Sequence, residues 1–280
     1  MNRKETEAAE RLINLALEED VAAGDITTDN LIPAGSRKKA LMVAKADGVI
    51  AGLPVAEMVF HKLDSTLQWM PQVNEGDHVS KGEVIARFEA SYRALLTGER
   101  TALNFLQRLS GIATLSARYV HAVSGFKTVI LDTRKTLPGF RLLDKYAVKT
   151  GGASNHRIGL FDMAMIKDNH IEVAGGITPA ITQIRSRIPA GVQIEVETTN
   201  LDQVQEAIRA GADIIMLDNM DNETMAAAVK LINGQARVEA SGNMTIARLK
   251  EVAATGVDYI SIGALTHSVQ ALDISQRIES

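Results

Sequence analysis

The sequence predicts an α/β protein whose second half is an open, incomplete α/β barrel. Four β-like runs begin at residues 192, 213, 236 and 258, so their starts are 21, 23 and 22 residues apart. The helical segments Leu201–Ala210 and Ala247–Thr255 lie between such runs, and each is followed by a glycine, which commonly ends a helix. Strand–helix units in series are typical of a parallel sheet with crossover helices, and several of them favour a barrel.

The N-terminal part begins with a helix and continues as β-structure. Apolar residues recur at helical spacing between Glu5 and Asp20, and Gly24 and Asp25 end that helix. Between residues 37 and 89, glycines separate segments that have the composition of strands, namely 39–45, 67–70 and 84–88. A longer helix is expected from Tyr92 to about Val123.

The segment 74–83 is similar to the hairpin of a lipoyl- or biotinyl-type half-barrel. This similarity raises the hypothesis of a non-enzymatic carrier module with Lys81 as the acceptor. An acceptor lysine needs an exposed tight turn, and Lys81 precedes Gly82 without the usual flanking methionines. We therefore expect a structural β-hairpin here.

Two further barrel strands are expected upstream of the four regular ones, at 127–131 and 163–166. The barrel then extends from about residue 125 to 265, which is short for the eight strand–helix units of a complete barrel. An open barrel with fewer strands fits this length.

Composition excludes several classes of function. The 280 residues include no cysteine, which excludes disulfides, thiolate nucleophiles, iron–sulfur clusters and cysteine-ligated zinc. Aromatic residues make up 4%, too few for a base-stacking nucleic-acid surface. The longest stretch without Asp, Glu, Lys or Arg, Tyr259–Leu272, is too short and polar to span a bilayer, and the start has no signal-peptide pattern. We expect a cytoplasmic enzyme that binds neither nucleic acid nor membrane.

In such barrels the chemistry lies where the strands end, and the residues there form two sets. The first set is basic: Arg134, Lys135, His156, Arg157 and Lys167. The second is acidic or rich in glycine: Glu197, Asp218, Ser241, Gly242, Asn243 and Gly263. Residues 132–170 contain seven Lys or Arg against four Asp, a local charge of +3 in a chain of net charge −4. An acidic protein therefore carries one basic pocket.

These residue types predict a pocket for an anionic small molecule and a phosphorylated sugar. Arginine binds carboxylate or phosphate through two hydrogen bonds at once. Two carboxylates on neighbouring strands suit Mg²⁺ or sugar hydroxyls, and glycines let backbone amides approach a phosphate. Two other interpretations stay open. Lys167 and Glu197 can form a structural ion pair, and Lys167 also has the placement of a Schiff-base lysine of an aldolase, although its polar neighbours make that chemistry less natural.

Ordered motifs along nearly the whole chain resemble those of the quinolinate phosphoribosyltransferase family. In the barrel they are DTRKTLPG from Asp132, GGASNHR from Gly151, IKDNH from Ile166, EVE from Glu195, LDN from Leu217, EASGN from Glu239 and GALTH from Gly263. Upstream they are GDITT from Gly24 and GERTALN from Gly98.

The resemblance implies an N-terminal α/β sandwich domain at residues 1–115, joined by part of the tail 268–280, and an open α/β barrel at 116–267. It implies transfer of the phosphoribosyl group from phosphoribosyl pyrophosphate to quinolinate with decarboxylation, giving nicotinate mononucleotide, pyrophosphate and CO₂ in de novo NAD biosynthesis. Mg²⁺ is the implied cofactor. A homodimer or higher oligomer is also implied, in which Arg100 of one subunit completes the site of the other. The alternative is a paralogous phosphoribosyltransferase with another ring acceptor.

The same resemblance assigns roles to the site residues. Quinolinate would be held by Thr133, Arg134, His156, Arg157, Lys167 and the trans Arg100. The second substrate would be bound through its phosphates by Lys135, Ser241, Gly242, Asn243, Gly263 and His267. Glu197 and Asp218 would bind the ribose hydroxyls and Mg²⁺, directly or through water. The catalytic set is Lys135, Lys167, Glu197 and Asp218.

Overall fold

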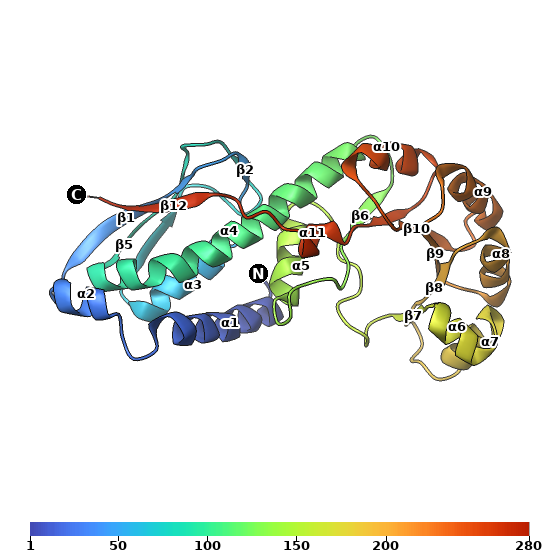
Figure 1. The fold of residues 1–280 in the computed structure, drawn as a ribbon, viewed down its shortest axis with the longest axis horizontal. Coiled ribbons are helices and arrows are strands. Elements are labelled where there is room, and N and C mark those ends of the chain that lie inside the picture. The colour runs from blue at the N-terminus through green and yellow to red at the C-terminus, as the bar shows by residue number, and fades with distance from the viewer. Residues whose placement is uncertain (280) are drawn as a thin grey trace. The chain divides into compact units, whose positions relative to one another are not determined.

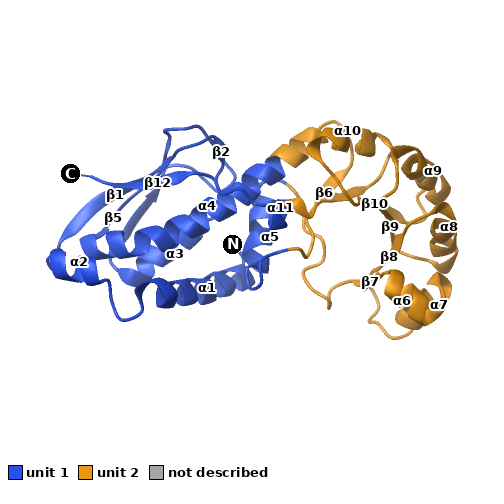
Figure 2. Cartoon of the chain, in the orientation of Figure 1, with its two compact units in different colours: residues 1–117, 136–152, 265–280 blue, residues 118–135, 153–264 orange. Residues whose placement is uncertain are grey.

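The computed structural model describes residues 1–279, which divide into two compact units (Figure 2). Unit 1 comprises residues 1–117, 136–152 and the chain from Leu265 onward. Unit 2 comprises residues 118–135 and 153–264. The sequence places residues 136–152 in the barrel, whereas these residues cluster with unit 1.

Unit 1 is built on an antiparallel sheet with the strand order β12-β1-β5-β3 (Figure 1). Its strands are β1 (Arg37–Ala44), β3 (Gln68–Pro71), β5 (Val84–Ser91) and β12 (Ile274–Ile278). Its helices are α1 (Arg3–Val21), α2 (Ile26–Leu31), α3 (Leu53–Leu63), most of α4 (Tyr92–Ala122), α5 (Arg141–Thr150) and nearly all of α11 (Ala264–His267). The expected helices at 5–20 and 92–123 and the three expected strands are therefore confirmed.

The core of unit 1 is an aromatic cluster between α3 and the sheet. Phe60 of α3 and Phe88 of β5 are buried, and their ring centroids lie 4.9 Å apart. Trp69 of β3 lies 4.9 Å from Phe88 and 6.4 Å from Phe60, again between centroids. Offset aromatic contacts in this distance range add to the stabilisation from burying the rings.

The expected hairpin at 74–83 is wrong. Residues His78–Val79 form β4, which pairs with β2 (Gly48–Val49), and not with the strand that follows. The side chain of Glu75 explains the difference, because its carboxylate accepts hydrogen bonds from the N–H groups of Gly52 and Leu53 at the start of α3. A negative charge is stabilised at a helix N-terminus, and this contact draws the segment to β2. The carrier hypothesis thereby loses the hairpin it requires.

Unit 2 is an open barrel of six parallel strands with the order β6-β11-β10-β9-β8-β7 (Figure 1). The strands are β6 (Val129–Leu131), β7 (Ala164–Ile166), β8 (Ile194–Thr198), β9 (Ile214–Asp218), β10 (Arg237–Ser241) and β11 (Tyr259–Ser261). The helices α6 (Asp168–Ala174), α7 (Ile177–Arg185), α8 (Leu201–Ala210), α9 (Asn222–Ile232) and α10 (Ile246–Ala254) lie outside it. Because β6 and β7 stand at the two edges, the sheet does not close.

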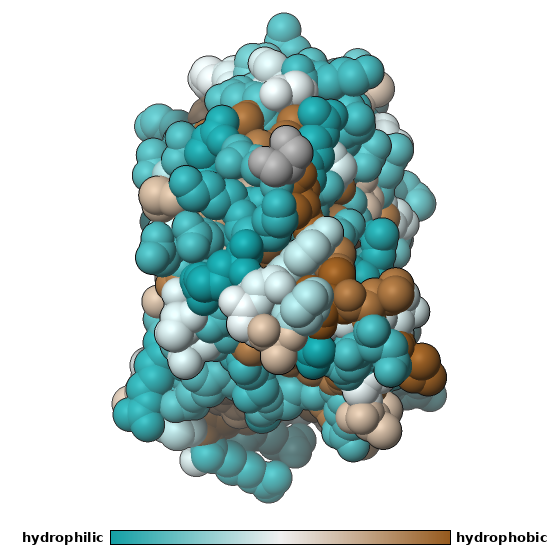
Figure 3. All heavy atoms as spheres, turned by 90° about the vertical axis from the view of Figure 1, so that its left-hand side faces the viewer, coloured by the Kyte–Doolittle hydropathy of each residue, from teal (hydrophilic) through white to brown (hydrophobic). Residues whose placement is uncertain are grey.

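The polar surface is interrupted by single apolar side chains. Ile26 and Leu31 of α2 are 84% and 73% exposed, and the face of the molecule in Figure 3 is largely hydrophilic with a few hydrophobic areas. Within residues 1–279, no helix combines the length and apolar character needed to cross a membrane.

Two glycines inside α4 test how tightly unit 1 is packed. A Cβ added at Gly111 would lie 2.2 Å from the backbone oxygen of Gln270, whereas a Cβ at Gly98 would first meet the flexible Leu63 Cδ1 at 2.8 Å. Alanine favours a helix over glycine by about 1 kcal/mol at either position. We expect Gly111→Ala to lower the free energy of unfolding by about 1–3 kcal/mol, because backbone cannot move aside, and Gly98→Ala to lower it less. Urea unfolding of both variants measures this, and equal effects would contradict it.

Candidate active site

The inner face of the unit 2 barrel carries charged side chains among apolar ones, whereas the outer face under the helices is apolar. In β8, Glu195 and Glu197 alternate with Ile194 and Val196, which are fully buried. Side chains alternate between the two faces of a strand, so the two glutamates share the inner face. The parallel register brings Asp218 of β9 beside Ser241 of β10 on the same face. Glu197 lies within β8, and Asp218 and Ser241 are the last residues of β9 and β10. The sequence had predicted that all three directly follow a strand.

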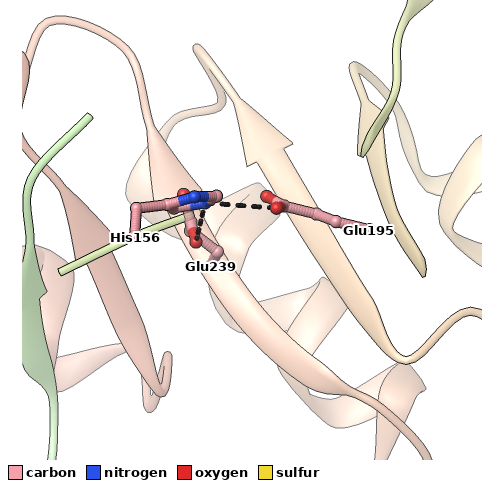
Figure 4. Close-up of side chains that lie close together, drawn as sticks. All are labelled: His156, Glu195 and Glu239. Carbon is pink, nitrogen blue, oxygen red and sulfur yellow. Dashed lines mark ion pairs between the residues drawn. The ribbon is translucent and has the colours of Figure 1, made fainter. Parts of the chain in front are cut away.

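Three inner side chains meet in a buried group: His156, Glu195 and Glu239 (Figure 4). The Nε2 atom of His156 lies 3.1 Å from Glu195 Oε2 and 3.3 Å from Glu239 Oε2. The side chains are 6%, 0% and 1% exposed in the same order. Ionised carboxylates are rarely buried unless a cation or donor compensates them, so His156 makes this pair of glutamates tolerable.

The group has the composition of a small metal site, because its three ligand atoms lie within 4.8 Å of one another. The ring nitrogens favour a proton instead. The backbone N–H of Arg157 donates to Nδ1 of His156 at 2.8 Å. A neutral ring that accepts at Nδ1 carries its proton on Nε2, which is the atom facing both carboxylates. In the neutral ring that accepts this bond, and equally in an imidazolium, Nε2 carries a proton that faces the two carboxylates.

The two glutamates also favour a second proton on His156. Burial alone lowers the pKa of the imidazole, but the hydrogen bonds and charges of Glu195 and Glu239 raise it to about 10. An imidazolium has no acceptor at Nδ1, so this protonation breaks the bond from Arg157. That bond is worth about 0.5–1.5 kcal/mol, less than compensating a buried carboxylate, so we assign the imidazolium at neutral pH. Burial likewise raises the pKa of Glu195.

Asp132 holds the segment that carries His156. This aspartate follows β6 and is fully buried. Its Oδ1 accepts the backbone N–H of His156 at 2.8 Å, and its Oδ2 accepts the side-chain amide of Asn155 at 2.7 Å. Ser154 also bridges to Leu131 of β6. The segment is therefore fixed beside β6 at the carboxyl edge of the sheet.

Arg157 and Arg134 supply the cationic part of the site. Arg157 donates to the backbone oxygen of Met163 at 3.0 Å, and its guanidinium is part-buried. Burial and the nearby charge of Arg134 lower the pKa of Arg157, and the charge of Glu195 opposes that change. The two guanidiniums are close enough to repel each other, so a bound dianion would stabilise the site.

Lys167 and Glu197 form the ion pair that the sequence raised as an alternative, with Nζ and Oε2 2.6 Å apart. The pair is not buried, since the lysine side chain is 46% exposed and the glutamate 20%. A Schiff-base lysine usually lies in an apolar pocket, whereas Lys167 is partly exposed and paired with a carboxylate. The aldolase hypothesis therefore has no support in the geometry.

The remaining expected residues lie in both units. Thr133 accepts a hydrogen bond from the backbone N–H of Lys135 at 3.1 Å, just after β6. Ser241 ends β10, Gly242 and Asn243 follow it, and Gly263 follows β11 at the rim of the barrel. Arg100, exposed on α4, and His267, exposed on α11, belong to unit 1. The structure thus groups most of the expected residues on one rim of unit 2.

The sequence-based selection missed Glu195, Glu239 and Asp132 as parts of the site. Each of them is a carboxylate within or directly after an apolar strand, a position where charge is normally excluded. Glu195 also stands two residues before Glu197 and shares its face. The signal that the sequence offered for these residues was a charged side chain at a strand position expected to be buried.

Comparison with protein families gives two matches that together cover most of the chain. A family model described as the N-terminal domain of quinolinate phosphoribosyl transferase matches residues 25–110. The model of the C-terminal domain of the same enzyme matches residues 112–277. The matched ranges include every residue of the rim described above.

Individual relatives are similar over nearly their whole length. A probable nicotinate-nucleotide pyrophosphorylase (carboxylating) of Synechocystis sp. is 49% identical, over 94% of this chain and 90% of that protein. Its counterpart in Bacillus subtilis is 44% identical, over 96% and 92%. The solved structure of the nicotinate-nucleotide pyrophosphorylase from Francisella tularensis matches with a TM-score of 0.94 at 41% identity, covering 98% of this chain and 96% of that one.

The buried group predicts a pH dependence of stability. Because the folded-state pKa of His156 lies above its ordinary value of 6.5, its contribution is fully present below about pH 6.5 and is lost as the pH rises toward 10. Glu239→Gln removes one carboxylate, so the pKa of His156 should fall and the free energy of unfolding should decrease less between pH 6.5 and 10 than in wild type. Urea unfolding across this range, with an NMR titration of His156, measures both effects.

Glu223→Gln on the exposed start of α9 is the matched control, since it makes the same chemical change outside the group. It should keep the wild-type slope. If Glu239→Gln also keeps that slope, the assignment of the proton to this group is wrong.

Proposed function

The chain belongs to the quinolinate phosphoribosyltransferase family, and on that premise we propose that the carboxyl-end rim of unit 2 is its active site. The enzyme transfers the phosphoribosyl group of phosphoribosyl pyrophosphate to quinolinate, giving nicotinate mononucleotide, pyrophosphate and CO₂ in de novo NAD biosynthesis. The family predicted from the motifs is thereby confirmed. One observation carries the assignment of the site: the rim has cations after β6 and β7 and carboxylates at the ends of β8 and β9.

Quinolinate is a dicarboxylate, and the cationic part of the rim fits two carboxylates. Arg134 and Arg157 can each bind one carboxylate through paired hydrogen bonds. Lys167 adds a third cation, which Glu197 orients at 2.6 Å. Thr133 can donate its hydroxyl, and His156 adds positive charge from beneath. We assign these five residues to quinolinate.

Phosphoribosyl pyrophosphate fits the other part of the rim. Lys135, one residue beyond Arg134 and exposed, would bind its pyrophosphate. Ser241, Gly242, Asn243 and Gly263 lie at the carboxyl ends of the neighbouring strands β10 and β11. Gly242 has a φ of +91°, a conformation in which backbone amides can turn toward an anion. The family resemblance adds His267 to this phosphate-binding set. Glu197 and Asp218 would accept hydrogen bonds from the ribose hydroxyls.

Glu197 and Asp218 also suit Mg²⁺. Magnesium is typically held by one or two carboxylates, with substrate phosphates and waters completing its shell. The two side chains stand on adjacent parallel strands and face the same side. When bound, the ion would neutralise charge that develops on the leaving pyrophosphate.

The reaction follows from this arrangement. The ring nitrogen of quinolinate donates its lone pair to ribose C1, and the bond from C1 to the pyrophosphate oxygen breaks with its electrons on the leaving group. Carboxylates near C1 stabilise the oxocarbenium-like transition state. The pyridinium ring then accepts the electron pair of the bond to the 2-carboxylate as CO₂ leaves, and C2 takes up a proton. Holding nitrogen and C1 in line supplies up to about 7–11 kcal/mol of the barrier reduction in well-oriented systems.

We also propose a homodimer, or a higher oligomer built from it, in which Arg100 of one subunit completes the site of another. Arg100 is exposed on α4 in unit 1, whereas the rim belongs to unit 2. A fourth cation would suit the two carboxylates of quinolinate. The family resemblance supports this arrangement.

The central assay incubates the protein with quinolinate, phosphoribosyl pyrophosphate and Mg²⁺. We expect nicotinate mononucleotide and CO₂ in equal amounts, and loss of both when EDTA removes the metal. Other pyridine and heteroaromatic acids serve as competing acceptors. If quinolinate gives no product, or if another ring acid is strongly preferred, the proposed function is wrong.

Arg134→Ala tests the division of the rim. Loss of a charged hydrogen-bonding partner costs about 2–5 kcal/mol, so quinolinate binding should weaken by that amount while phosphoribosyl pyrophosphate binding changes little. Calorimetry with each substrate alone measures the two affinities. Arg185→Ala, which removes the exposed ion pair with Asp213, is the control and should change neither. Equal loss of both affinities in Arg134→Ala would count against the assignment.

Mixing two inactive variants tests the trans role of Arg100. In a dimer of Arg100→Ala with Lys167→Ala, one of the two sites has both native residues if Arg100 acts across the interface. Random exchange of subunits should then restore about a quarter of wild-type activity. A residue that acts within its own subunit leaves no intact site in the hybrid, so no recovery would overturn the proposal.

A further inference from the structure

Asn219 has an unusual backbone conformation next to the carboxylate part of the rim. It directly follows Asp218, the last residue of β9, and has a φ of +53°. This left-handed conformation is costly for most side chains and is tolerated mainly by glycine, asparagine and aspartate. The roles assigned so far do not use this residue.

Three hydrogen bonds join Asn219 to both sides of the rim. Its backbone N–H donates to the carbonyl of Ser241 at 3.0 Å. Its side-chain amide Nδ2 donates to Asp218 Oδ2 at 2.8 Å. Its Oδ1 accepts from Nδ2 of Asn243 at 3.2 Å. One side chain therefore connects the carboxylate that ends β9 with the loop that follows β10.

The same side chain fills the space beside Gly242. A Cβ added to Gly242 would lie 2.2 Å from Asn219 Oδ1, closer than atoms can approach without a shift. Gly242 thus serves two purposes, since its φ of +91° needs glycine and its missing side chain leaves room for Asn219. The loop and the asparagine are packed as one unit.

We propose that Asn219 is a positioning residue for phosphoribosyl pyrophosphate, which sets the Asp218 carboxylate and the loop 241–243 in register with each other. This inference rests on the proposed function, in which Asp218 binds the ribose and the loop binds phosphate. Asn219 acts through both groups and touches neither substrate. Its amide leaves Asp218 with one oxygen engaged and fixes the direction of the other.

We expect the loss of the Asn219 side chain to weaken the binding of only one of the two substrates. Quinolinate is assigned to cations that follow β6 and β7, and Asn219 contacts none of them. Loss of a supporting hydrogen bond to a metal-ligating side chain typically costs about 10–100-fold in metal affinity or activity, and we expect a similar cost at Asp218. The loss should fall on phosphoribosyl pyrophosphate.

Two substitutions separate backbone from side-chain effects. Asn219→Asp keeps the left-handed backbone accessible but replaces the amide donor by a carboxylate facing Asp218. Asn219→Gly also keeps the backbone and removes both side-chain bonds without repulsion. Asn233→Asp is the matched control, because Asn233 also has a positive φ, +45°, and is an exposed helix cap on α9.

Steady-state kinetics with quinolinate, phosphoribosyl pyrophosphate and Mg²⁺ is the test. We expect Asn219→Asp to raise KM for phosphoribosyl pyrophosphate by about 10–100-fold with KM for quinolinate changed by less than about threefold. Asn219→Gly should lie between it and wild type, and Asn233→Asp should match wild type. If Asn219→Asp equals Asn233→Asp, or if both KM values rise together, the inference is overturned. A wild-type protein that forms no product would instead overturn the proposed function.

A second measurement tests the packing against Gly242. Gly242→Ala is made in wild type and in Asn219→Gly, and KM for phosphoribosyl pyrophosphate is compared. Because Asn219→Gly removes the colliding Oδ1, the added methyl group should raise KM by a smaller factor in that background. An equal factor in both backgrounds would show that the two residues do not act together.

Discussion

The site depends on the burial of two glutamates inside the barrel of unit 2. Glu195 on β8 and Glu239 on β10, with β9 between them, are almost completely removed from solvent on the inner face. A buried carboxylate is strongly unfavourable without a donor or counter-charge, and breaking such a pairing costs about 3–5 kcal/mol. His156 reaches both carboxylates through one nitrogen, so the loop that carries it must follow a defined path beside β6. Asp132 holds that path from the other side.

This requirement also places the cations of the rim. Arg157 directly follows His156 in the chain, so the loop that places the imidazole also places this arginine. Arg134 follows Asp132 by two residues, and its charge is felt at Arg157. The same short segments, around residues 132–134 and 154–157, thus hold His156 against the buried glutamates and carry the two arginines of the rim. Such a preorganised arrangement can receive a dianion without first reorganising, which is where much of the catalytic power of polar sites originates. The charge of Glu195 opposes the effect of Arg134 on Arg157 before any substrate arrives.

Local patterns predicted most of the fold. The 3.6-residue period and the glycine caps located α1, α4, α8 and α10, and all six barrel strands were found within about two residues. The hairpin at 74–83 failed because the pairing of β4 depends on the contact of Glu75 with α3, which no local pattern contains. The short helices α5 and α6 were missed inside a segment read mainly for its charges. In the structure β8 extends from Ile194 to Thr198, so Glu197 lies within the strand. Glu195, two residues earlier, therefore shares its face.

By itself, the sequence determined the family, the alternation of strands and helices, and which charged residues stand at the strand ends. These properties depend on residue identity and on spacing within a few positions. Only the tertiary structure decided that His156 lies between two glutamates, that Lys167 pairs with Glu197 at the surface, and that Asn219 joins two strand ends. The physical reason is that charge belongs to a residue, whereas burial and hydrogen-bond partners come from strands far apart in the chain. The role of a carboxylate in an apolar strand can therefore be assigned only when its neighbours across the barrel are known.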